Sequence, residues 1–290
     1  MAEQNDSGCA KPTTDTSTGH SLSESAYLDS HFEAMKPEYE EMLRWVGMQP
    51  GWKVLDAGCG GGSYLPLLSE LVGPSGNITA HDLAPENIER VDSLVREKTF
   101  CCQVQTRVGN LVSLPYEDDS FDAVWCANIT QYLTNEELEK MLAEFRRVVK
   151  PGGLIAVKEF DITAHAQCPF DPSIFWRLFN EARNSMAHMD QIFRALELPV
   201  WLKRAELVDT KYKTFLSERK SPLRPVERAF ITSIFQFQAD AAEKISLPEK
   251  DKTFWRDFRN VNSQNHILNS QDLYFREGHI VVTGVVPKSV

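Results

Sequence analysis

The sequence predicts a doubly wound α/β fold, in which helices cover both faces of a central sheet. Three observations predict it. Short apolar segments alternate with amphipathic segments between residues 52 and 159, a glycine-rich turn follows the first apolar segment, and the segment 121–127 is apolar almost throughout. Strands of a parallel sheet that is covered on both faces have this continuous apolar pattern. We expect a three-layer sandwich with a seven-stranded, mostly parallel sheet, its last strand antiparallel, plus a helical cap.

The elements up to residue 160 follow from local patterns. Apolar residues at helical spacing between Glu24 and Val46 predict N-terminal helices, which end before the turn signal Pro50-Gly51. Strands and helices then alternate, and each helix has its apolar residues on one face. The expected strands are 52–57, 77–82, 104–108, 121–127 and 154–159, and the expected helices are 64–72, 85–96 and one that begins at 134. Thr134 and Glu137 have the spacing of a capping box, which predicts that helix start.

The rhythm changes after residue 159. Asp171-Pro172 predicts the start of a helix, 208–216 predicts a strand, and 225–245 has the pattern of a long amphipathic helix. The alternating apolar segment 278–286 predicts a final edge strand. These segments complete the sheet and leave long apolar helices that a minimal core does not need.

We therefore expect three regions along the chain. Residues 1–23 are polar and predict a disordered tail, and residues 24–160 predict a cofactor-binding core with N-terminal helices. Residues 161–290 supply the remaining strands and two cap insertions. The strands are expected at about 206–217 and 278–287, and the insertions at about 162–205 and 218–275.

Charge and composition narrow the class of function. The chain has 31 Lys and Arg against 41 Asp and Glu, a net charge of −10, which argues against nucleic acid as the partner. No apolar run is long enough to span a membrane, and no export signal is present. The six cysteines form no C-x-x-C pair. We expect a cytoplasmic protein with reduced thiols, no bound metal and a small-molecule substrate.

The glycine-rich turn is the motif that carries the chemistry. It places Gly58, Gly60 and Gly62 between a strand and a helix, where the backbone turns with positive φ and a ligand can approach closely. Asp82 lies twenty residues further on, at the end of the second strand, where a carboxylate can accept hydrogen bonds from a ribose diol. The dinucleotide template G-x-G-x-x-G fails in both registers, because its last position falls on Ser63 or Leu65. The pattern therefore argues against an NAD site.

In four segments the chain resembles the class I S-adenosylmethionine-dependent methyltransferases, whose core is Rossmann-like. The subgroup it is similar to comprises the ubiquinone and menaquinone C-methyltransferases (methyltransferase type 11-like). The segments are Asp56-x-Gly58-x-Gly60-x-Gly62, His81-Asp82, the run from Gly109 to Val124, and Arg147-Val-Val-Lys-Pro-Gly-Gly153. Together they cover about residues 50–160 and are specific for the superfamily, but they say almost nothing about the substrate.

The resemblance implies a cofactor, S-adenosylmethionine, that leaves as S-adenosylhomocysteine. Gly58 and Gly60 would face its methionine end, Asp82 would hold the ribose, and Asn110 would border the adenine. Many relatives have Asp where this chain has Asn110, whose amide oxygen can still accept a hydrogen bond. The complete expected set is Asp56, Gly58, Gly60, Gly62, Asp82, Leu83, Asn110, Leu111 and Asn128.

The catalytic residue is less determined, because the sulfonium donor is already activated and the protein mainly aligns the reactants and excludes water. A general base is optional. Tyr132, Glu159 and His165 are weak candidates for that role. Weak candidates for acceptor contacts are Tyr27, His31, Gln131, Tyr132 and Trp176.

The expected function is methyl transfer to a small organic acceptor, by in-line displacement under the helical cap. Two alternatives stay open. The chain could bind S-adenosylmethionine and catalyse another reaction, as pericyclases and cyclases of secondary metabolism do, or it could be a cofactor-binding regulatory protein. Release of S-adenosylhomocysteine distinguishes methyl transfer from both.

Overall fold

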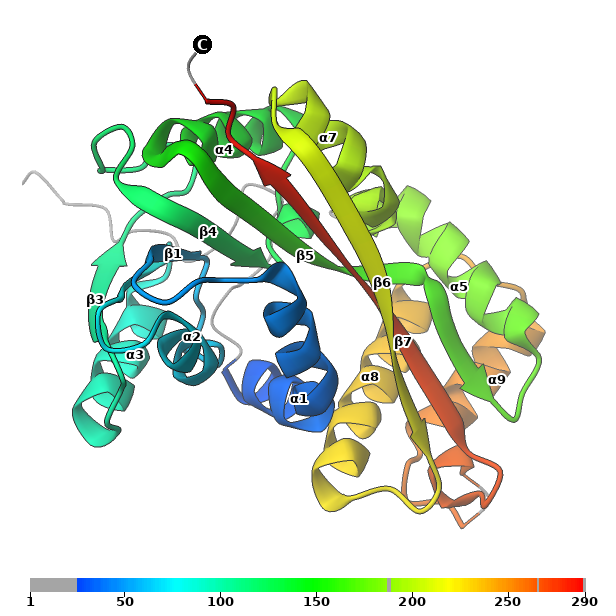
Figure 1. Cartoon of the computed structure of the whole chain (residues 1–290). Coiled ribbons are helices and arrows are strands. Elements are labelled where there is room, and N and C mark those ends of the chain that lie inside the picture. Colours follow the sequence, from blue (N-terminus) through cyan, green and yellow to red (C-terminus); the bar gives the residue numbers. More distant parts are fainter. Residues whose placement is uncertain (1–24, 187–188, 265, 289–290) are drawn as a thin grey trace, which may run out of the picture.

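The computed structural model describes residues 25–186, 189–264 and 266–288, and within them seven strands form one sheet (Figure 1). The order across the sheet is β3-β2-β1-β4-β5-β7-β6. The strands are β1 (Lys53–Ala57), β2 (Asn77–Asp82), β3 (Gln103–Val108), β4 (Phe121–Ala127), β5 (Val149–Cys168), β6 (Val208–Lys220) and β7 (Tyr274–Val285). The predicted doubly wound fold is thus confirmed.

β7 is the antiparallel strand, and its position corrects one expectation. The first five strands are mutually parallel, whereas β7 runs antiparallel to β5 on one side and to β6 on the other. The sequence analysis predicted an edge strand near 278–286, but the edge is β6. The reason is visible in the burial: the side chains from Phe275 to Thr283 are almost all buried, whereas those of β6 are largely exposed.

The helices cover both faces of the sheet. In Figure 1, α4 and α7 lie above the sheet, and α1, α2, α3 and α8 lie below it. The α-helices are α1 (Ser25–Val46), α2 (Leu65–Val72), α3 (Pro85–Glu97), α4 (Asn135–Val148), α5 (Pro172–Ser185), α6 (Met189–Ile192), α7 (Leu198–Arg204), α8 (Pro225–Lys244) and α9 (Glu249–Arg259). Three short 3₁₀ turns, η1 (Thr130–Tyr132), η2 (Phe193–Glu197) and η3 (Ile267–Asn269), complete the chain.

Three strands are much longer than the core needs. β5 was expected to end at Glu159 but continues to Cys168, because β7 keeps pairing with it past a register shift between Asp161 and Ala166. β6 pairs with β7 over the same length. In Figure 1 these strands extend beyond α1, and α5, α8 and α9 pack around the extension. Of the predicted cap segments, α5, α8 and α9 therefore lie at one end of the sheet, whereas α7 covers its upper face.

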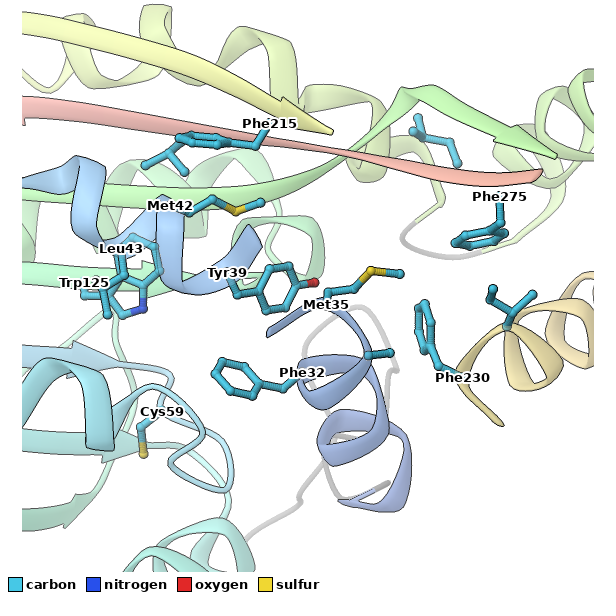
Figure 2. Close-up of a cluster of buried hydrophobic side chains, with 14 of the residues drawn as sticks. Phe32, Met35, Tyr39, Met42, Leu43, Cys59, Trp125, Phe215, Phe230 and Phe275 are labelled. Atoms are coloured by element: carbon cyan, nitrogen blue, oxygen red, sulfur yellow. The ribbon is translucent and has the colours of Figure 1, made fainter. Parts of the chain in front are cut away.

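The core has a separate apolar cluster on each face. On the lower face, α1 packs on the sheet, and Figure 2 shows Tyr39 and Met42 on α1 facing Trp125 and Phe215 of the sheet. On the other face, α4 and α7 bury a second cluster that includes Phe145. Because both faces are buried, the central strands are apolar at consecutive positions, as the sequence indicated.

The capping box predicted for α4 is present. The backbone N–H of Glu137 donates to Thr134 Oγ1 at 3.2 Å, and the Thr134 N–H donates to Glu137 Oε2 at 2.8 Å. We expect Thr134→Ala to lower the free energy of unfolding by about 1 kcal/mol, because one helix-end N–H loses its acceptor. Urea denaturation measures it, with Thr134→Ser as the control that keeps a hydroxyl at the cap. Equal losses in the two variants would show that the hydroxyl does not stabilise the helix.

Other sequence expectations concern thiols, metals and membranes. The five cysteines in the described residues are free thiols. The same residues hold no group of three His, Cys, Asp or Glu side chains placed to bind a metal ion. None of the described helices has the length and low polarity that a membrane-spanning segment needs.

Candidate functional site

The glycine-rich turn connects β1 to α2 and is fixed to the end of β2. Its backbone takes positive φ at three positions, 76° at Gly58, 52° at Gly60 and 83° at Gly62, a conformation that glycine adopts without strain. The N–H groups of Gly58 and Cys59 both donate to the carbonyl oxygen of His81, at 2.8 and 3.1 Å. The turn is therefore positioned by backbone hydrogen bonds, and a Cβ atom on Gly58 or Gly62 would collide with the side chain of Ile129 or Leu65.

Asp82 joins the turn from the end of β2. Its Oδ2 accepts from the N–H of Gly60 at 2.8 Å, and its Oδ1 accepts from the N–H of Ala84 at 2.9 Å and from Asn87 Nδ2 at 3.0 Å. Burial raises the pKa of this carboxyl, and the three donors lower it in part. A carboxylate has about four lone-pair positions, so a ribose diol must share these oxygens or displace the Gly60 N–H.

Asp56 is the second buried carboxyl, at the end of β1. It is 2 % exposed, and its Oδ2 has no hydrogen-bond partner among the described residues. Burial, with a smaller contribution from the charge of Asp82, raises the pKa of Asp56 to about 8. A buried carboxyl oxygen without a partner is costly, so this atom indicates a missing donor or cation at the turn.

The remaining predicted cofactor residues lie at the same edge of the sheet. Leu83 follows Asp82 and is half-buried, and Asn110 is exposed, with its Oδ1 accepting from the Val112 N–H at 3.1 Å. Leu111 is buried, and its Cδ1 would lie 3.8 Å from a Cβ on Gly58. Asn128 takes a positive φ of 58° directly after β4. The fold thus brings together the ends of β1, β2, β3 and β4, while the binding role of each residue stays a prediction.

A buried polar group that the sequence analysis missed lies beside Asn128. Lys158 on β5 is 0 % exposed, and its Nζ donates to Asn128 Oδ1 at 2.7 Å and lies 4.3 Å from the centre of the Tyr39 ring. Glu277 and His279 of β7 are buried on the same side, and the Tyr39 hydroxyl lies 2.7 Å from Nε2 of His31. We call these five residues, His31, Tyr39, Lys158, Glu277 and His279, the Lys158 cluster.

The three catalytic candidates lie outside this cluster. Glu159 follows Lys158 and so projects from the opposite face of β5, where its Oε1 accepts from the Thr130 N–H at 2.5 Å. Burial, with the charge of Glu159 adding to it, raises the pKa of Tyr132. His165 stacks on Phe175 with ring centres 4.6 Å apart, and burial lowers its pKa to about 4. Their surroundings give Glu159 the role of holding the segment after β4, and they place His165 among the aromatic rings of α5.

Of the candidate acceptor contacts, one lies in the Lys158 cluster and the others lie outside it. His31 belongs to the Lys158 cluster and stacks on Phe230 of α8, with ring centres 4.5 Å apart and planes 2° from parallel. Gln131 is half-buried near Asn128, whose carbonyl it approaches at 3.4 Å. Trp176 contacts Phe175 in α5, away from the glycine turn. The side chain of Tyr27 lies outside the described residues.

Comparison with known proteins agrees with this geometry. The methyltransferase domain family matches residues 54–153, the part of the chain that holds the glycine turn and strands β1 to β4. Demethylmenaquinone methyltransferase of Staphylococcus aureus is 34% identical over 133 residues. Residues 54–153 are thus similar to the class I S-adenosylmethionine-dependent methyltransferases. The resemblance seen in the sequence, to the ubiquinone and menaquinone C-methyltransferase type, is thereby confirmed, with S-adenosylmethionine as the cofactor of the family.

The sequence similarity to the curated relatives covers only part of each chain. The aligned part covers 44% of this chain and 51% of the S. aureus protein, so the chain spans about half the length of the curated relatives it matches. Solved structures agree in fold. The YcgJ protein of Bacillus subtilis superposes with a TM-score of 0.54 at 17% identity, over 88% of this chain and 100% of its own. A methyltransferase of Aquifex aeolicus gives 0.51 at 24% identity, over 67% and 90%.

Proposed function

We propose that this protein transfers the methyl group of S-adenosylmethionine to a small organic acceptor by in-line displacement. The observation that carries the proposal is the glycine turn hydrogen-bonded to the carboxylate of Asp82 at the carboxyl edge of a doubly wound sheet, the edge at which such folds bind ligands. The donor needs no further activation, so the protein has to align the two reactants and exclude water.

The residues present suit the donor. The turn offers the glycine backbone of residues 58, 60 and 62 for the methionine portion, and Asp56 supplies a buried carboxyl oxygen, Oδ2, that has no partner among the described residues and could face a cationic group. Asp82 would hold the ribose hydroxyls, Leu83, Asn110 and Leu111 would border the nucleoside, and Asn128 would face the methionine portion. These assignments follow from the family resemblance, and the position of each residue at the strand ends is compatible with them.

The acceptor would lie between the cofactor and the predicted cap. Support comes from α8, whose Phe230 stacks on His31 of α1 and whose helix packs against both α1 and α5. Cap and α1 therefore share a contact beside the Lys158 cluster. The S. aureus relatives are named for demethylmenaquinone, and the aromatic side chains around His31 suit an acceptor with an apolar part. With its net charge of −10, the chain is a poor match for nucleic acid.

Two measurements test the proposal. Titration calorimetry with S-adenosylmethionine and S-adenosylhomocysteine should show binding, with NADH as a control nucleotide that should not bind. Incubation with methyl-labelled S-adenosylmethionine and a panel of small acceptors should then give labelled product and stoichiometric S-adenosylhomocysteine. Absence of binding to either cofactor form would disprove the assignment, and substrate consumption without S-adenosylhomocysteine would indicate a non-methylating reaction.

Asp56 gives the binding step a pH dependence. Its pKa of about 8 in the free protein should fall when the cationic donor lies beside it, because a positive charge favours the ionised form. Binding at pH 7 then releases a proton, so affinity rises with pH up to about 8 and is flat above it. Calorimetry in buffers of different ionisation enthalpy measures the proton count, and Asp56→Asn should release none. Equal counts for the variant and the unmodified protein would assign the proton to another group.

A further inference from the structure

The Lys158 cluster is more polar than a packing core requires. Lys158, Glu277 and His279 are at most 3 % exposed. The Nε2 atoms of His31 and His279 lie 3.3 and 3.8 Å from Glu277 Oε2. Both ring nitrogens of His279 lack a hydrogen-bond partner among the described residues. Each buried polar atom without a partner costs free energy, so such atoms are rare unless a ligand or a water completes them.

Further polar atoms without partners lie on the side of the cluster that faces the cofactor edge. They are the hydroxyl of Tyr64, at the start of α2, and Nε1 of Trp125 on β4, both buried. The Tyr64 ring lies 6.0 Å from that of Tyr39 and 5.2 Å from that of Trp125. Figure 2 shows Trp125 and Tyr39 on the same side of the sheet, next to α1. The atoms without partners therefore lie along one face, between the segment after β1 and the cluster.

Asn128 connects this group to the donor site. Its Oδ1 accepts from Lys158 Nζ, and its backbone N–H donates to the carbonyl oxygen of Lys158 at 2.8 Å. Asn128 is the residue expected to face the methionine portion of the cofactor. The lysine amine thus lies one side chain away from the place where the methyl group would be presented.

We propose that Lys158 is a catalytic residue that takes a proton from a weak oxygen acid, so that the acceptor reacts as an oxyanion. This inference rests on the proposed function. The acceptor O–H gives its proton to the neutral amine, which becomes an ammonium. The electron pair of the resulting anion forms the new bond to the methyl carbon, the bond from that carbon to sulfur breaks, and its pair stays on sulfur as a neutral thioether. The ammonium later returns the proton to solvent.

The surroundings of Lys158 suit both the neutral amine that takes the proton and the ammonium that then lies beside the anion. Burial lowers its pKa below that of an exposed lysine, which makes a neutral amine available, and the charges of Glu159 and Glu277 oppose the shift only in part. His31 and Tyr39 on α1, His279 on β7 and Arg219 on β6 also face this region. Burial keeps His279 neutral by lowering its pKa strongly. An anion beside the protonated amine would give it a direct ion pair, where the structure has the neutral amide of Asn128.

The test uses matched acceptors with the full-length protein. 2-Naphthol, phenol and 4-ethylphenol, whose hydroxyl groups stay protonated at neutral pH, are offered with methyl-labelled S-adenosylmethionine, beside their O-methylated forms and 2-naphthylamine. We expect transfer to at least one of the acids and none to the blocked forms. For the accepted acid, Lys158→Met should lower kcat at least 100-fold and leave S-adenosylhomocysteine affinity within about threefold. The rate of the unmodified protein should rise with pH along a limb that the variant lacks.

Two further variants keep the result interpretable. Lys213→Met alters a lysine of β6 on the same face whose side chain is 44% exposed, and it should keep the full rate. Tyr39→Phe keeps the ring over which the amine lies and removes only the hydroxyl 2.7 Å from His31 Nε2, so it should reduce kcat much less than Lys158→Met does. Transfer only to the amine, transfer to no acid although S-adenosylmethionine binds, or an unchanged rate in Lys158→Met would each overturn the inference. A failure of S-adenosylmethionine to bind would instead disprove the proposed function.

Discussion

Replacing Asp82 by alanine should weaken S-adenosylhomocysteine binding by about 30- to 800-fold. The variant loses two expected hydrogen bonds to a buried ribose diol, at about 1–2 kcal/mol each, and each 1.4 kcal/mol is a factor of ten in the dissociation constant. It also removes the acceptor of the Gly60 N–H, 2.8 Å away, which holds the turn against β2. Calorimetry with S-adenosylhomocysteine measures the change.

Asn87→Ala is the matched control. Asn87 donates to Asp82 Oδ1 at 3.0 Å but would not touch the ribose, so its loss should weaken binding by less than about tenfold. Asp82→Asn keeps the size of the side chain and one acceptor oxygen, and it should fall between the other two. An unchanged affinity in Asp82→Ala would contradict the ribose assignment, and equal effects of the alanine variants would give Asp82 a structural role only.

The fold of the first 160 residues was predictable because its signals are local. The glycine turn, the capping box at Thr134 and the apolar strand at 121–127 each fix a piece of backbone from neighbouring residues. The parallel direction of these strands agrees with the crossover connections between them, whereas their order is not local, because β4 pairs with β1 and not with β3. The end of β5 was not predictable in this way, because its extension to Cys168 depends on pairing with β7, more than a hundred residues later.

The candidate site likewise has one part that local sequence predicts and one part that depends on long-range pairing. The turn and Asp82 belong to one strand–turn–helix–strand unit, and their spacing identified them. The Lys158 cluster draws on α1, β5 and β7, and its members face one another only once the register of Lys158 with Val281 is set. One signal was available. Lys158 directly follows the apolar run 154–157 of a strand expected to be covered on both faces, and a lysine at such a position is a candidate for burial with a partner and for function.

Burial of Arg219 suggests what holds α1 over this site. Its guanidinium, on β6, donates to the carbonyl oxygen of Ala34 at 2.6 Å and to both carboxylate oxygens of Glu38 at 2.7 and 2.8 Å. It also lies 2.9 Å from Glu227 of α8. One side chain that is 8% exposed thus connects α1, α8 and the edge strand, and α1 carries two members of the Lys158 cluster.

Arg219→Met should lower the free energy of unfolding by about 3–5 kcal/mol, because two carboxylates and a carbonyl lose their buried cation at once. Urea denaturation measures the loss. Arg224→Met is the control: its side chain is 55% exposed and pairs with the same Glu227, so its loss should cost less than about 1 kcal/mol. In the double variant Arg219→Met with Glu38→Leu, much of the stability should return, since one of the uncompensated charges is then gone. If Arg219→Met is as stable as the unmodified protein, apolar packing alone anchors α1. The arginine could then be replaced without loosening the helix that covers the site.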